Sequence, residues 1–129
     1  MVYQISALYV GILAILGLAL AYGVIKHRAR SELSIGYDNE EMHGAIRRFG
    51  NFTEYVPLAL IVIVMSESTG APGWAIHAMG AGLVVGRILH AMGLDAGKAA
   101  TVPRFVGTIL THLVLLAGGI WLIYGFLTS

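Results

Sequence analysis

Cysteine is absent from this chain of 129 residues. Its absence excludes disulfide bonds, thiolate metal sites and a cysteine nucleophile, so any thiol used here must arrive on a small molecule. Charge is also scarce, because only 12% of the residues are charged and the formal net charge is +1. No glycine-rich phosphate loop follows a plausible strand, and we expect no nucleic-acid partner.

Apolar residues, by contrast, make up 57% of the chain, more than in ordinary soluble domains. Residues 2–25 carry no charged side chain and exceed the roughly 20 residues needed to cross a bilayer. Three further segments qualify: residues 49–65 with about a turn added at either end, 74–94 and 105–127. The sequence therefore predicts an all-α integral membrane four-helix bundle forming one domain over residues 1–129.

A secretory signal peptide is the competing interpretation of the first segment. Ala19-Leu20-Ala21 resembles a cleavage site. The segment lacks a basic leader, however, and its apolar run is longer than a signal peptide requires. These two features favour a membrane helix.

The basic residues predict how the chain is oriented. They lie in the connection after the first segment, at the start of the second, and between the third and fourth. The connection at 66–73 contains Glu67 and no lysine or arginine. Because basic loops stay in the cytoplasm, both basic connections are predicted to be cytoplasmic and both termini to lie outside.

One face of the predicted second helix is polar. Arg47, Asn51 and Glu54 are spaced at i, i+4 and i+7, and Glu40 and His43 fall on the same stripe. The stripe runs directly into the apolar stretch that follows. Ionisable residues carried into lipid are rare and mark function in most cases.

Two other helices supply polar residues at a similar depth. Arg87 and His90 lie near the cytoplasmic end of the third, and Arg104 opens the fourth, with Thr108 and Thr111 continuing its face. The crossing order brings these groups into the same leaflet as the stripe. We therefore predict one polar cavity open to the cytoplasm.

A purely structural role is the alternative. Glu54 and Arg87 would then pair with each other, while interfacial arginines extend to lipid phosphates, an explanation that we favour for Arg48 and Lys98. For the whole set, Arg47, Arg87 and Arg104 exceed what Glu54 can neutralise. The surplus favours an anionic ligand, and the planar arginine fork suits a carboxylate.

The remaining histidines and the glycines have simpler interpretations. His77 is expected at the outer interface, and His112 lies deeper than His90, which disfavours a haem held between them. Small residues on three helices indicate close helix packing. They are Ala7, Gly11, Gly17, Ala21, Gly80, Gly82, Gly86, Gly107, Gly118 and Gly119.

The spacing of Arg47, Asn51, Glu54, Tyr55 and Pro57 resembles the second-helix signature of the MAPEG family, the membrane-associated proteins in eicosanoid and glutathione metabolism. The run Gly86-Arg87-Ile88-Leu89-His90 and the arginine opening the fourth helix are similar to that family as well. The likeness covers the whole chain and is closest to the bacterial branch, whose members resemble microsomal glutathione transferases. A bacterial inner-membrane location is implied.

The resemblance implies a homotrimer that binds glutathione, as cosubstrate, at subunit interfaces. Arg47, Asn51, Glu54 and Tyr55 would contact glutathione, and Arg87 would support the pocket. Arg104 would be the catalytic residue, stabilising the thiolate electrostatically with no covalent intermediate. The implied activity is that of a transferase or peroxidase acting on a lipophilic electrophile that arrives through membrane lipid, and no metal is implied.

The sequence departs from the family pattern at two positions, and two other functions stay open. Leu94 stands where animal members have a tyrosine, and Gly50 where several have a basic residue. One alternative is a small proton-coupled multidrug exporter. Such exporters carry an intramembrane glutamate in their first helix, which has no charge here. The other is a noncatalytic membrane protein that binds lipid or a partner protein.

Overall fold

The computed structural model describes residues 3–95 and 97–128, and within them the regular structure consists of four helices and no strand. They are α1 (Gln4–Ser31), α2 (Glu40–Ser68), α3 (Gly73–Gly93) and α4 (Val102–Thr128). Each is long and apolar enough to cross a membrane. The predicted all-α membrane bundle is confirmed.

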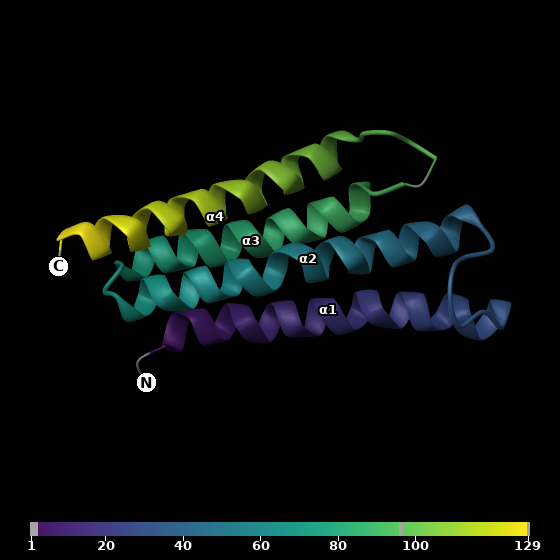
Figure 1. Ribbon diagram of the computed structural model, residues 1–129, viewed down its shortest axis with the longest axis horizontal. Coiled ribbons are helices and arrows are strands. Elements are labelled where there is room, and N and C mark those ends of the chain that lie inside the picture. Colours follow the sequence, from purple (N-terminus) through teal and green to yellow (C-terminus); the bar gives the residue numbers. More distant parts are fainter. Residues whose placement is uncertain (1–2, 96, 129) are drawn as a thin grey trace.

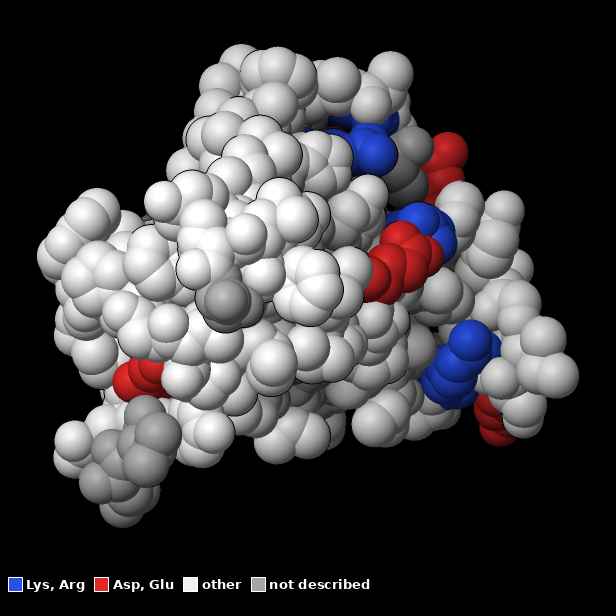
Figure 2. All heavy atoms as spheres, turned by 60° about the vertical axis from the view of Figure 1, so that its left-hand side comes forward, with Lys and Arg blue, Asp and Glu red and all other residues white. Residues whose placement is uncertain are grey.

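The helices lie side by side and run in alternating directions (Figure 1). Both ends of the chain lie at one end of the bundle with the short 69–72 turn, while the 32–39 and 94–101 connections lie at the other. Figure 2 shows a surface that is mostly uncharged, with lysine and arginine side chains gathered along one side of the view. The two basic connections thus share one end of the bundle.

The connection between the first two helices is shorter than the hydropathy pattern predicts. The predicted segments end at residue 25 and resume about a turn before residue 49, whereas the connection in the structure spans only 32–39, because α1 continues through its basic residues to Ser31 and α2 begins at Glu40. At the start of α2, the Asn39 side chain accepts a hydrogen bond from the Met42 amide at 2.9 Å, which caps the helix. The apolar segment shows which part of a helix crosses lipid, whereas the capping residue determines where the helix begins. Val2, the expected start of the first segment, lies outside the described residues.

The buried core is narrow and draws on every helix. Its centre is formed by Leu13, Phe52, Val56, Ala59, Ile63, Ile76, Leu83 and Val114. The outside of the bundle is equally apolar: Leu18 is 71% exposed and Trp74 is 75% exposed. A soluble protein would not expose so many large hydrophobic residues, and here they are suited to contact lipid.

Glycines allow α3 and α4 to approach each other closely. A Cβ added at Gly107 would meet the Gly86 carbonyl and the backbone of His90, and one added at Gly80 would meet the Tyr9 ring. Phe52 and Val62 likewise occupy the space that an added Cβ would need at Gly17 and Gly118. The expected packing role holds for these positions. Gly11 and Gly119 do not pack against another helix of the same subunit, since an added Cβ would meet nothing within 4 Å.

This packing predicts a difference between two glycine variants. Gly107→Ala forces α3 and α4 apart and should destabilise the protein by about 1–3 kcal/mol, the usual cost of overpacking. Gly119→Ala is the matched control on the same helix, where the added methyl group meets open space. Thermal unfolding in detergent should show a lower Tm for Gly107→Ala only. Equal Tm values for the two variants would contradict the close approach.

Candidate functional site

A polar cavity with two lobes lies among α2, α3 and α4 at the end with the basic connections. The inner lobe, of about 200 Å³, is lined by Asn51, Tyr55, Arg87, His90, Arg104, Thr108, Thr111 and His112. The mouth lobe, of about 180 Å³, is lined by His43, Gly44, Arg47, Asn51, Leu94, Asp95, Lys98, Ala99 and Arg104. Asn51 and Arg104 line both lobes, so the two share a wall. Of the predicted site residues, Glu54 alone lines neither lobe.

Arg87 is the most deeply buried charge, with 2% of its surface exposed. Its Nη2 donates to Asn51 Oδ1 at 2.6 Å and lies 3.4 Å from His90 Nδ1. Its Nε is buried without a hydrogen-bond partner among the described residues. Asn51 thus fixes the guanidinium at the wall of the inner lobe, and one donor stays unsatisfied at a cost in stability.

Glu54 pairs with Arg47 on its own helix. Arg47 Nη1 lies 3.5 Å from Glu54 Oε1, and both side chains are about half exposed, at 50% and 52%. The alternative pairing of Glu54 with Arg87 is therefore wrong. Arg87 and Arg104 form no ion pair with a carboxylate in the part of the chain that the structure describes. Two arginines that make no ion pair with a carboxylate of the described residues thus line the cavity.

Arg104 lies where the two lobes meet, in the first turn of α4. Its Nη1 donates to the Ala99 carbonyl at 3.1 Å, and its backbone amide donates to Thr101 Oγ1. The Thr101 hydroxyl in turn donates to the Gly93 carbonyl at the end of α3. Because an added Cβ at Gly93 would meet the Arg104 backbone, only glycine permits this approach. The end of α3 therefore positions Arg104.

His112 is a residue of the inner lobe to which sequence reasoning gave no role. Its ring lies 5.5 Å from the Tyr55 ring, at an interplanar angle of 46°. A sequence signal was present: Thr108, Thr111 and His112 continue the face of α4 that Arg104 begins.

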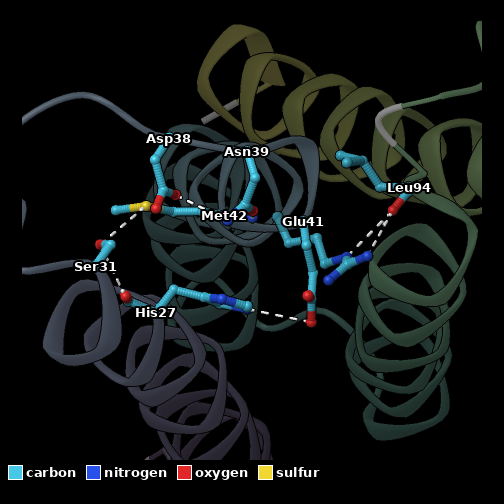
Figure 3. A network of polar contacts seen from close by, with 8 residues as sticks. His27, Ser31, Asp38, Asn39, Glu41, Met42 and Leu94 are labelled. Atoms are coloured by element: carbon cyan, nitrogen blue, oxygen red, sulfur yellow. Dashed lines mark hydrogen bonds and ion pairs between the residues drawn. The ribbon is translucent and has the colours of Figure 1, made fainter.

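Arg48 does not extend toward lipid phosphates as predicted. Its Nε and Nη2 donate to the Leu94 carbonyl at 3.2 and 3.0 Å, which are the two bonds that reach Leu94 in Figure 3. The explanation as an interfacial anchor is wrong, because the carbonyl at the end of α3 lacks a helical partner and attracts a cation. Lys98 lies 3.7 Å from Asp95, in an exposed ion pair.

Polar contacts also join α1 to α2 at both ends. Near the basic end, His27 Nε2 lies 3.7 Å from Glu41, and the Ser31 hydroxyl contacts the Met42 sulfur (Figure 3). At the other end Glu67 is not in a loop as expected, but in the last turn of α2. Its carboxylate accepts the amides of Ile5 and Ser6 at 3.0 and 2.9 Å, which satisfies free donors at the start of α1.

Known proteins resemble this chain over most of its length. Residues 6–124 match the MAPEG family. The Inner membrane protein YecN of Escherichia coli (strain K12) is 33% identical over 119 residues, covering 85% of this chain and 91% of that protein. The protein of the same name in Escherichia coli O6:H1 (strain CFT073) gives the same identity and coverage. With the family matched from the first helix to the last, this four-helix membrane protein belongs to the MAPEG family.

Proposed function

We propose that the protein binds glutathione in the two-lobed cavity and conjugates its thiolate to a lipophilic electrophile, as a membrane transferase, or reduces such a substrate as a peroxidase. The observation that carries the proposal is the pair of cavity arginines, Arg87 and Arg104, that lack a carboxylate partner among the described residues. The proposal also takes support from the MAPEG family, whose name refers to glutathione metabolism.

The chemistry of the lobes suits this tripeptide. Glutathione carries two carboxylates, one ammonium group and a thiol. The mouth lobe offers Arg47 and Lys98 to carboxylates, and Glu54, which lies 3.5 Å from Arg47, is the proposed partner of the ammonium group. The thiol would then lie at the shared wall, beside Arg104. A cation there lowers the pKa of a thiol and favours the nucleophilic thiolate.

The site is incomplete in a single subunit. Arg47, Glu54 and His112 are each exposed on the outside of one bundle, although their helices are suited to lie in lipid. Charged groups that face hydrocarbon are costly, so a second copy of the chain would have to cover them. The proposed assembly is a homotrimer with the cavity at its subunit interfaces.

The assembly predicts a measurable stoichiometry. Native mass spectrometry or cross-linking in mild detergent should give three chains per particle. A uniform monomer that still binds glutathione would contradict the interface site. Gly11 and Gly119 face outward in the single subunit, and cross-linking through cysteines introduced at these two positions would show which faces meet.

A proton-coupled exporter and a noncatalytic binding protein are the rival functions. An experiment with purified protein separates all three. A transferase forms the glutathione conjugate in detergent, without any gradient. An exporter forms none, yet moves substrate across sealed vesicles when a proton gradient is applied. A noncatalytic member does neither, and glutathione or lipid binding is then its measurable property.

The proposed location is the bacterial inner membrane, in keeping with the name of the similar Escherichia coli proteins. We propose that the 32–39 and 94–101 connections face the cytoplasm and both termini face outward, because the basic residues gather at the end with these connections. Glutathione would then reach the mouth lobe from the cytoplasm. Cysteines introduced at each end and labelled in intact cells would report the orientation.

A further inference from the structure

The inner lobe carries positive charge at its most buried point. Arg87 is only 2% exposed and lines this lobe together with Arg104. A guanidinium keeps its charge in a protein. Glu54 attracts Arg87 only from a distance, because its carboxylate pairs with Arg47 at 3.5 Å. A charge buried at membrane depth without a partner is destabilising, so the folded protein needs a counter-ion for Arg87 that the described residues do not supply.

The neutral groups around Arg87 leave hydrogen-bond donors free but supply no negative charge. Asn51 Oδ1 accepts from Arg87 Nη2 at 2.6 Å, which leaves the Asn51 NH2 group as a donor. His90 Nδ1 lies 3.4 Å from the same Nη2, and because a guanidinium only donates, the proton of the neutral imidazole is assigned to Nε2. The two threonines of the lobe donate their hydroxyl protons to carbonyls of α4 itself, both at 2.9 Å. Free donors beside an unpaired cation suit an anion.

We propose that the inner lobe binds a small monovalent anion of the chloride class, held by the Arg87 guanidinium and by the N–H donors of Asn51 and His90. A lobe of about 200 Å³ has room for such an ion and several waters. The ion is the counter-ion of Arg87, whereas Arg104, at the wall shared with the mouth lobe, stays available to a thiolate. The anion site goes beyond the proposed glutathione function and does not depend on it, since it rests on the charge and donors of the lobe alone.

Binding of this ion should make the stability of the protein depend on chloride, because an ion that binds only the folded state shifts the unfolding equilibrium. The purified protein, without glutathione, would be unfolded by heat in an uncharged detergent and in mixtures of sodium chloride and sodium lactobionate. These mixtures keep the ionic strength constant, and lactobionate is a disaccharide acid too bulky for the lobe. With a Kd on the order of 30 mM, about 300 mM chloride lowers the unfolding constant about tenfold and should raise the Tm by about 3–6 °C.

Two variants remove the need for the ion in different ways. Arg87→Gln removes the charge, and Asn51→Asp puts a carboxylate where the Asn51 oxygen now lies 2.6 Å from the guanidinium. Both should lose the chloride response, and in lactobionate alone Asn51→Asp should unfold at a higher Tm than the wild type. Arg30→Gln is the matched control, because it makes the same chemical change at the exposed end of α1, outside the inner lobe. The line width of the chloride NMR signal reports binding directly and should increase with wild type and Arg30→Gln only.

Equal Tm values of the wild type in the two salts would overturn the inference, because water alone would then satisfy Arg87. A chloride response in Asn51→Asp as large as that of the wild type would also overturn it, since the ion would then bind elsewhere. If Arg87→Gln does not fold, Asn51→Asp decides the test, because aspartate has the shape of asparagine. None of these results depends on glutathione. A wild type that responds to chloride but binds no glutathione would overturn the proposed function and leave the anion site standing.

Discussion

Replacing Arg47 with alanine, or Glu54 with glutamine, should weaken glutathione binding by about 30- to 4,000-fold, which corresponds to about 2–5 kcal/mol. The two side chains pair at 3.5 Å beside the mouth lobe. In the complex we expect Arg47 to bind a ligand carboxylate and Glu54 the ammonium group. Removing either leaves a charge without its partner in a site that the ligand and the neighbouring subunit close to water. Calorimetry in detergent measures the change.

Arg30→Ala is the matched control for Arg47→Ala, because it removes one positive charge from the exposed end of α1, outside both lobes. Its affinity for glutathione should equal that of the wild type. The double variant at positions 47 and 54 should lose less than the sum of the two single losses, since these side chains contact each other. Unchanged affinity in folded single variants would show that the polar stripe is structural.

Replacing Arg104 with alanine should lower turnover by about 100-fold or more while reducing glutathione affinity less than the α2 variants do. The guanidinium stands where the lobes meet, and the proposed role is to stabilise the thiolate. A positive charge lowers the pKa of a thiol from its free value of about 8.5. Loss of that charge raises the pKa of the bound thiol, so that less thiolate is present at neutral pH and the pH–rate profile moves to higher pH.

Ultraviolet absorbance of the thiolate, followed against pH with glutathione bound, reports this shift directly. Arg104→Lys should recover part of the effect, because a point charge can stabilise a thiolate although it cannot reproduce the planar fork. Two results would contradict the role: a wild type that shows no thiolate below pH 8, or an Arg104→Ala variant with the same titration. Arg104 would then act only through its bond to the Ala99 carbonyl, as part of the α3–α4 connection.

The four helices could be predicted from sequence because membrane spans depend on composition alone. Uncharged apolar segments of sufficient length must become helices in lipid, where each backbone group needs an internal partner. The same rule misplaced the ends of α1 and α2, since both helices continue beyond their apolar parts. Asn39 and the acidic first turn of α2 carry the missing information, which is a capping signal.

The residues that line the cavity could be predicted from sequence for a similar reason, but the side chains that they contact could not. Helical spacing places Arg47, Asn51 and Tyr55 near one face, and the crossing order brings Arg87 and Arg104 to the same end. Which side chains actually meet depends on how each helix is rotated about its axis and how far it is shifted along it. Spacing within one helix fixes neither quantity.

Contacts between helices show this limit most clearly. Arg48 reaches the Leu94 carbonyl across 46 residues of sequence, and Glu67 caps the start of α1 from the far end of α2. Both bonds satisfy free backbone groups at helix ends. The sequence shows that such groups exist, but only the assembled bundle shows which side chain is within reach.

Equilibrium binding of glutathione to the purified, folded protein tests the central claim most directly. Dialysis against labelled glutathione should show saturable binding that an S-alkyl glutathione displaces and that free cysteine, which lacks the second carboxylate of the tripeptide, does not. Binding should be lost in Arg47→Ala and retained in Arg30→Ala. Absence of saturable binding in wild-type protein that unfolds cooperatively would contradict the account, and the cavity would then belong to another ligand.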